Sequence, residues 1–223
     1  MILTLANVID EASHARILEQ VAQAEFVDGR ETAGAQLAQT KRNKQISRHD
    51  PALGRISAIV HESLRNNRAF REATCPRQLH SVMVSRYGPG MAYGAHVDNA
   101  LMGEQTAWRT DLSLTLFLNA PEDYDGGELC METGSGEIGF KLPPRHMLCY
   151  PTSDLHRVNE ITRGERLVVV AWIQSFVRDH RAREILWDLA QAREELADKA
   201  DARQTWDRVN KAHTNLLRRW AET

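Results

Sequence analysis

The sequence has few cysteines, and they do not form a disulfide or metal-binding pattern. Cys75, Cys130 and Cys149 are widely spaced, and no CxxC pair occurs. This spacing argues against a disulfide-stapled secreted domain and against a zinc knuckle. We therefore expect a protein of the reducing cytoplasm.

Long apolar runs are also missing, as is an excess of charge of either sign. No stretch approaches the roughly 20 apolar residues of a membrane span, and the opening MILTLANVIDEASHARILEQ lacks the basic leader of a signal peptide. The 28 Lys and Arg residues nearly balance the 30 Asp and Glu residues, which gives a formal charge of -2. Neither nucleic acid nor a membrane is expected as a partner, whereas a small molecule or a peptide is.

Periodicity divides the chain into three parts. Helical spacing predicts one helix from Asp10 to Ala24 and another from Pro51 to about Arg71. After Pro76, short β-rich runs separated by Gly, Pro, Asn and Asp predict a sandwich or barrel, with a jelly roll as the candidate. We expect an α+β fold with a supporting helical segment (1–75), a jelly-roll or double-stranded β-helix domain (76–178) and a C-terminal helical extension (179–223).

Two features outside the predicted barrel have simple interpretations. The cluster Lys41, Arg42 and Lys44 is expected to be a solvated surface. The C-terminal extension is expected to form two amphipathic helices that join near residues 199–201. They would pack on the barrel or on another subunit, and the apolar stripe with Trp206 and Trp220 would suit a homo-oligomer.

The stretch YGAHVDNA, residues 93–100, places His96 and Asp98 one residue apart. Alternate residues of a strand point to the same face, so the two side chains would project side by side. His156, which begins a late strand in a polar context, supplies a third candidate ligand. Two histidines and one carboxylate form the facial triad that leaves three positions open on octahedral Fe(II). Each residue alone is a weak signal, because His and Asp near a glycine-rich loop are most often ordinary turn residues.

Arg166 follows His156 by ten residues and opens the aliphatic run RLVVVAWIQ. Burying a guanidinium without an anion is costly, so this position predicts a bound carboxylate. A dicarboxylate co-substrate would suit the bidentate arginine fork. The alternative is an ion pair with Glu160 or Glu165.

The order and spacing of these motifs resemble the Fe(II)- and 2-oxoglutarate-dependent oxygenases of the prolyl 4-hydroxylase type, and within them the bacterial PKHD-type hydroxylases. The matching stretches cover most of the chain and include FVDGRETAG, KRNKQI, SRYGPGMAYGAHVDNA, RTDLSLTLFLN, DYDGGEL and YPTSDLHRVNEITRGERLVVVAWIQS.

The resemblance implies a site and a reaction. His96, Asp98 and His156 would be the catalytic residues that hold the iron, and Arg166 would bind the distal carboxylate of 2-oxoglutarate. Tyr87 would face the co-substrate or would simply be a packing aromatic. The enzyme would use O2 to hydroxylate its substrate while 2-oxoglutarate is decarboxylated to succinate, with L-ascorbate (vitamin C) re-reducing the iron.

Three further features depart from the family pattern or concern residues to which the resemblance assigns no role. Arg145 and His146 stand where the family usually has a glycine and an acidic residue, which puts the turn conformation in question and offers His146 as a competing metal ligand. The loop 99–109 is either a lid over the substrate or an ordinary connection whose Trp108 covers the core. Trp172 is expected to be a core residue.

Two rival functions compete with the oxygenase. A cupin-like metalloenzyme on a similar barrel would use no 2-oxoglutarate and would leave Arg166 unexplained. A non-catalytic sensor would keep the iron site as a switch and use its C-terminal helices to engage a partner. For the oxygenase itself, the substrate could be a peptide, a small molecule or an iron chelator, and a link to iron uptake or iron homeostasis is a family-level association.

Overall fold

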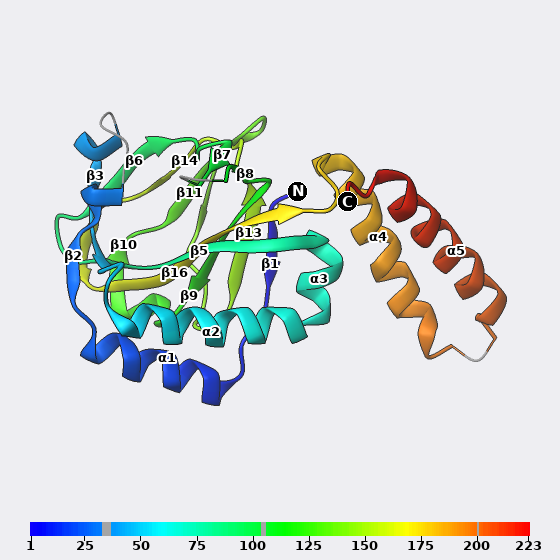
Figure 1. The fold of residues 1–223 in the computed structure, drawn as a ribbon, viewed down its shortest axis with the longest axis horizontal. Coiled ribbons are helices and arrows are strands. Elements are labelled where there is room, and N and C mark those ends of the chain that lie inside the picture. Colours follow the sequence, from blue (N-terminus) through cyan, green and yellow to red (C-terminus); the bar gives the residue numbers. More distant parts are fainter. Residues whose placement is uncertain (33–36, 104–105, 200) are drawn as a thin grey trace.

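Two antiparallel sheets packed against each other form the centre of the protein (Figure 1). The computed structural model describes residues 1–32, 37–103, 106–199 and 201–223. The larger sheet has the order β1 (Leu3–Leu5), β13 (Met147–Pro151), β9 (Leu112–Phe117), β16 (Arg166–Ser175), β5 (Pro76–Tyr87), β4 (Lys44–Ile46) and β2 (Phe26–Asp28). The smaller sheet has the order β12 (Gly136–Phe140), β11 (Leu129–Thr133), β14 (His156–Val158), β6 (Ala92–His96) and β3 (Lys41–Arg42). The predicted α+β jelly roll is confirmed.

The remaining short elements connect or flank the two sheets. Two further strand pairs link β10 with β15 and β7 with β8, and three 3-10 turns lie in the connections. Their bounds are β7 (Leu101–Met102), β8 (Trp108–Arg109), β10 (Tyr124–Gly126), β15 (Ile161–Gly164), η1 (Gly29–Thr32), η2 (Leu37–Gln39) and η3 (Pro121–Asp123).

The larger sheet buries both of its faces, because period-2 alternation sends neighbouring residues to opposite sides. On β16, Leu167, Val169 and Ile173 pack into the cluster that contains the N-terminal helices. Val168 lies instead in the cluster between the two sheets. One strand therefore contributes to two separate interiors.

Helices α1 (Glu11–Gln23) and α2 (Pro51–Asn66) lie side by side across the outer face of this sheet (Figure 1). Asp10 caps α1, accepting a hydrogen bond from the Ser13 backbone amide at 2.6 Å. The prediction of one continuous helix to about Arg71 is wrong. The Asn67 backbone is extended and its side chain accepts from the Phe70 amide at 2.9 Å, which ends α2 and starts α3 (Arg68–Thr74).

The two predicted C-terminal helices are present as α4 (His180–Ala197) and α5 (Arg203–Trp220). Figure 1 shows them as a hairpin that projects from one end of the barrel. Leu216, Leu217 and Trp220 of α5 pack against a small cluster around Val177 and Leu186. The hairpin therefore packs on its own chain.

The N-terminal segment also supplies strands, which sequence patterns did not indicate. β3 pairs with β6 of the smaller sheet, and β4 pairs with β5 of the larger one. Residues 41–46 therefore cross from one sheet to the other at one side of the barrel.

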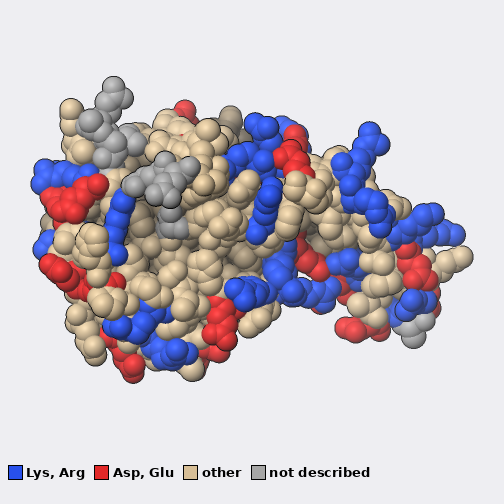
Figure 2. All heavy atoms as spheres, viewed as in Figure 1, with Lys and Arg blue, Asp and Glu red and all other residues tan. Residues whose placement is uncertain are grey.

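Charge is distributed as the composition predicts. On the face seen in Figure 2, Lys and Arg side chains are interspersed with Asp and Glu side chains. No helix in the described part of the chain is long and apolar enough to cross a membrane.

Candidate active site

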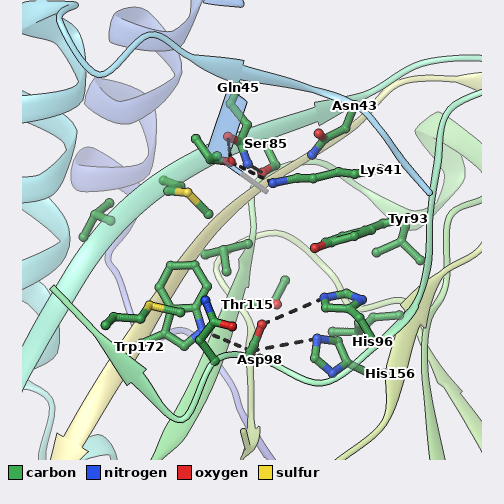
Figure 3. A pocket seen from close by; sticks show the side chains of 18 of the residues that line it. Lys41, Asn43, Gln45, Ser85, Tyr93, His96, Asp98, Thr115, His156 and Trp172 are labelled. Carbon is green, nitrogen blue, oxygen red and sulfur yellow. Dashed lines mark hydrogen bonds and ion pairs between the residues drawn. The ribbon is translucent and has the colours of Figure 1, made fainter. Parts of the chain in front are cut away.

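His96, Asp98 and His156 meet between the two sheets (Figure 3). His96 ends β6, His156 begins β14, and the two residues are direct cross-strand partners. Asp98 lies two residues past the end of β6, so it is not on the strand as the alternation argument assumed. One potential ligand atom from each of the three side chains lies within 4.8 Å of the others. Among the described residues, this is the one group of three or more such side chains gathered in this way.

The backbone fixes the orientation of both imidazoles. His96 Nδ1 lies 2.8 Å from the Gly94 carbonyl oxygen, and His156 Nδ1 lies 2.9 Å from that of Asp154. A carbonyl oxygen can only accept, so each Nδ1 carries the hydrogen and each Nε2 presents a lone pair. Each Nε2 lies 3.9 Å from an Asp98 carboxylate oxygen. Burial is the main cause that lowers the pKa of His96 to about 4, which keeps that ring neutral and able to bind a metal.

Two hydrogen bonds hold the Asp98 carboxylate. Ser113 Oγ donates to Asp98 Oδ2 at 2.5 Å, and the Trp172 indole Nε1 donates to the same oxygen at 3.0 Å. Ser113 and Trp172 are cross-strand partners on β9 and β16. Trp172 is buried, as predicted for a core residue, but its indole also orients a candidate ligand. Such outer partners set ligand geometry in metal sites.

Arg166 is the largest fully buried side chain, with 1% of its surface exposed. Its guanidinium carbon lies 5.3 Å from the ring centre of Tyr87, its register partner, and 5.4 Å from that of Phe117. Arg166 Nε is buried without a hydrogen-bond partner.

The alternative of an ion pair for Arg166 is wrong. Glu160 pairs with Arg42 at 3.1 Å, and Glu165 pairs with Arg86 at 3.3 Å. No ion pair to Arg166 occurs among the residues that the structure describes. An unpaired buried guanidinium is costly, so the arrangement fits a carboxylate that arrives with a ligand.

The triad and Arg166 line one cavity of about 680 Å³. This volume is in the range of small-molecule sites. Tyr87, the other predicted co-substrate residue, lines it as well. All five predicted site residues therefore border the same space.

The wall opposite Asp98 comes from residues 41–46 (Figure 3). The prediction of a solvated surface is correct for Arg42 and Lys44, which are exposed, and wrong for Lys41, which is 4% exposed. Strict alternation explains the difference, because Lys41, Asn43 and Gln45 point inward. Burial lowers the pKa of the Lys41 ammonium to about 8.

Comparison with known proteins gives the family. The sequence model of the 2OG-Fe(II) oxygenase superfamily matches residues 82–174. A PKHD-type hydroxylase of Synechococcus sp. (strain JA-2-3B'a(2-13)) is 44% identical over 223 residues and all of both chains. The chain belongs to the PKHD-type hydroxylases. Another PKHD-type hydroxylase, from Crocosphaera subtropica, is 41% identical over 222 residues, again across both full lengths.

Solved structures support the fold of this PKHD-type hydroxylase. A Trichoplax adhaerens prolyl hydroxylase, in complex with a hypoxia inducible factor peptide fragment, matches with a TM-score of 0.55 and 14% identity, covering 77% of this chain and 82% of that one. HygX from Streptomyces hygroscopicus, with nickel and 2-oxoglutarate bound, gives 0.55 and 13%, covering 79% and 84%. The PKHD-type hydroxylase is thus an Fe(II)- and 2-oxoglutarate-dependent dioxygenase on a jelly-roll fold.

The two departures from the family pattern have different outcomes. Arg145 adopts a φ of 69°, the left-handed conformation that a glycine takes without strain, so a larger residue occupies a turn position that favours glycine. Its backbone amide bonds to the Phe117 carbonyl at 2.9 Å. His146 is not part of the triad cluster, and its Nδ1 lies 3.1 Å from the Pro144 carbonyl. The suggestion that His146 competes for metal is therefore not supported.

The loop 99–109 of this PKHD-type hydroxylase combines features of both earlier interpretations. Leu101, Met102 and Gly103 line the cavity, as expected of a lid. Trp108 instead stacks on His80, with ring centres 3.6 Å apart, as expected of a connection that covers the sheet. Residues 104 and 105 lie outside the described part.

Sequence reasoning missed three residues that shape the site. Ser113 is one of two polar residues, with Thr115, in the run LSLTLF. It donates to Asp98, and Tyr93 stacks on His96 with ring centres 3.7 Å apart. Lys41 belongs to the basic cluster that was expected to be a solvated surface. All five residues of KRNKQ are polar, so no apolar alternation in the sequence marks Lys41 as buried.

Proposed function

We propose that His96, Asp98 and His156 hold Fe(II), that Arg166 binds the distal carboxylate of 2-oxoglutarate, and that Tyr87 packs beside that carboxylate. The enzyme would hydroxylate a small molecule or a peptide while 2-oxoglutarate is converted to succinate. The observation that carries the proposal is the buried, unpaired Arg166 in the same cavity as the triad. A cupin-like metalloprotein that uses no 2-oxoglutarate gives this arginine no role, whereas a non-catalytic sensor is distinguished from the oxygenase by its lack of turnover.

The protein's own groups have distinct tasks in this proposal. The two Nε2 atoms and the Asp98 carboxylate would hold the metal, and a two-histidine, one-carboxylate set is the kind that keeps positions on iron free for other ligands. Ser113 and Trp172 keep the carboxylate oriented before the metal arrives. Tyr87 and Phe117 flank Arg166 and keep water away from the ion pair that it forms. When bound, iron supplies the activation of O2 that side chains cannot provide.

Further parts of the proposal rest on the family resemblance and the composition. L-Ascorbate would re-reduce iron after unproductive turnover, and the substrate would connect the enzyme to iron uptake or iron homeostasis. The three unpaired cysteines suit a cytoplasmic location. Residues 76–178 would act as the catalytic domain, and the extension 179–223 would be available for homo-oligomer formation.

Anaerobic titration of the Fe(II)-loaded protein with 2-oxoglutarate tests the proposal. A chelated keto acid gives a weak metal-to-ligand charge-transfer band in the visible region. We expect this band in the wild type, its loss in His156→Ala, and a requirement for far more 2-oxoglutarate in Arg166→Met. Lys44→Met, on an exposed strand position, is the matched control and should behave as the wild type.

The outcomes separate the candidate functions. Iron binding without a band at any 2-oxoglutarate concentration would contradict the oxygenase site and favour the cupin-like protein. A band without O2-dependent succinate formation would favour the sensor.

A further inference from the structure

Lys41 is a buried cation on the wall of the cavity opposite Asp98 (Figure 3). It lies on β3 directly across from Tyr93 of β6, and its ammonium is 5.2 Å from the centre of the Tyr93 ring. Tyr93 in turn stacks on His96. A single aromatic ring thus separates the ammonium from a candidate iron ligand.

A hydrogen-bond network orients the ammonium without neutralising it. Lys41 Nζ donates to Thr32 Oγ1 at 2.8 Å, and Thr32 Oγ1 donates to Gln45 Oε1 at 2.7 Å. Gln45 Nε2 lies 3.4 Å from Ser85 Oγ. These partners are all uncharged. An ammonium has three donors, so this network leaves donor capacity for a ligand.

The charges around the cavity leave Lys41 without a counter-ion. Asp98 is the one acidic residue among the described residues that line it. In the proposed holoenzyme, the three positive charges of Fe(II) and Arg166 balance Asp98 and the two carboxylates of 2-oxoglutarate. Asp28 also attracts Lys41, but that carboxylate already binds the Arg30 side chain. Arg48 at the rim adds further positive charge.

A second buried polar group on the same wall lacks a partner. Asn43 is 4% exposed and lines the cavity, and both its side-chain nitrogen and its side-chain oxygen are buried without a hydrogen-bond partner. Leaving these groups unsatisfied is costly, so the amide is available to a ligand, its nitrogen as a donor and its oxygen as an acceptor. Together, the Lys41 ammonium and the Asn43 nitrogen offer donors to an oxygen-rich group.

We propose that Lys41 anchors an anionic oxygen group, a carboxylate or a phosphate, on the substrate that this enzyme hydroxylates. Asn43 donates a further hydrogen bond to the same group. The inference rests on the proposed function, because it takes the triad end of the cavity as the iron and 2-oxoglutarate site. It adds the substrate class: an acid, with its anionic group held on the β3 wall.

NMR of the lysine side chains tests the anchor directly. The protein is labelled with ¹⁵N-lysine, loaded with diamagnetic Zn²⁺ and saturating 2-oxoglutarate, and titrated with acetate, with inorganic phosphate or with neutral acetamide. We expect the Lys41 Nζ resonance to move saturably with acetate or with phosphate and to ignore acetamide. The anion that saturates at lower concentration identifies the group. Lys41→Arg assigns the resonance, and Lys44 reports the general effect of salt.

Two results would overturn the anchor. The first is a Lys41 resonance that stays fixed, or that moves only as Lys44 does. The second is release of bound 2-oxoglutarate as the anion saturates, because Lys41 would then belong to the co-substrate site. If 2-oxoglutarate does not bind the zinc-loaded protein at all, the proposed function fails, and the response of Lys41 is then measured with zinc alone.

Turnover gives an independent test. Compounds are screened as matched pairs, each an acid with its neutral amide or alcohol, for stimulation of O2-dependent succinate formation. The charged member should stimulate, and Lys41→Met should raise the concentration needed by about 10- to 100-fold, the usual value of a hydrogen bond to a charged group. Lys41→Arg should restore part of the effect, and Lys44→Met should match the wild type. Equal stimulation by neutral members would contradict the proposal.

Discussion

The two faces of the larger sheet show how one set of strands serves stability on one side and chemistry on the other. Towards the helices, β9 and β16 present Leu114, Leu116 and Val169, all essentially without solvent exposure. Towards the smaller sheet, alternate residues of the same strands include Ser113 and Arg166. On β9 and β16 the helix face is apolar from Leu112 to Leu116 and from Leu167 to Ile173, whereas the cavity face contains polar groups whose partners are other site residues or ligands.

This difference predicts which property, stability or ligand binding, a substitution on each face should change. Removing volume from the helix face leaves a void in a close-packed interior and lowers the free energy of unfolding. Removing a polar group from the cavity face should reduce ligand binding while costing little stability. Four predictions test this separation.

Arg166→Met should have the largest effect. Removing the buried partner of a charged ligand group costs about 3 to 5 kcal/mol, so the affinity for 2-oxoglutarate should fall by roughly 100-fold or more. The ligand-free protein should melt at the same or a higher temperature, because an unpaired buried charge is lost. Calorimetric titration and thermal unfolding measure the two quantities. A lower melting temperature with unchanged 2-oxoglutarate affinity would make Arg166 a structural residue.

Leu114→Ala should instead lower stability and leave ligand affinity unchanged. Leu114 is fully buried on the helix face, so truncation should reduce the free energy of unfolding by about 2 to 5 kcal/mol. Urea unfolding measures the loss, and 2-oxoglutarate affinity of the folded protein should not change. Thr115→Ser, its neighbour on the cavity face, is the control and should cost less than about 1 kcal/mol. Equal losses from both variants would remove the distinction between the faces.

Trp172→Phe should have an intermediate effect. It removes one of the two donors to Asp98 Oδ2 while keeping an aromatic ring in place. Loss of such a supporting contact typically weakens metal binding about 10- to 100-fold. Competition with a coloured chelator measures the Fe(II) affinity, and Ser113→Ala should have a similar effect through the other donor. Unaltered affinity in both variants would show that the carboxylate needs no support.

Changes in the 99–109 segment should have the smallest effect. If this segment covers the substrate, Leu101→Ala at the cavity mouth should alter substrate choice or raise succinate formation without product by a few fold. Trp108→Ala should do the same if the lid includes the tryptophan that stacks on His80. Product and succinate are measured together. Unchanged coupling in both variants would make this segment an ordinary connection.

Much of the fold could be predicted, because most of its helices and strands follow from local sequence patterns. The period-2 strands after Pro76, the first helix and the paired C-terminal helices all follow from short-range signals. The break at Asn67 did not, because its capping hydrogen bond competes locally with a continuous helical pattern. The strands β3 and β4 were missed, because two or three residues carry too little periodicity to identify a strand.

The candidate site was likewise predicted only in part. His96, Asp98, His156 and Arg166 were found because their spacing is itself a motif. Some tertiary contacts were missed: Trp172 is a core residue as predicted, but its hydrogen bond to Asp98 was not expected, and Lys41 was taken for surface. A single sequence does not show which strand a side chain will meet. Only the pairing of β3 with β6 brings Lys41 to Tyr93.

The crossing of residues 41–46 between the sheets has a consequence for how specificity can evolve. The five residues assigned to the cofactors lie from residue 87 onward, while the β3 wall comes from a separate stretch near the start of the chain. Residues 41–46 would thus determine substrate recognition, and their sequence could change without replacing a cofactor-binding residue. Exchanging this segment between relatives should transfer substrate preference and leave cofactor use unchanged.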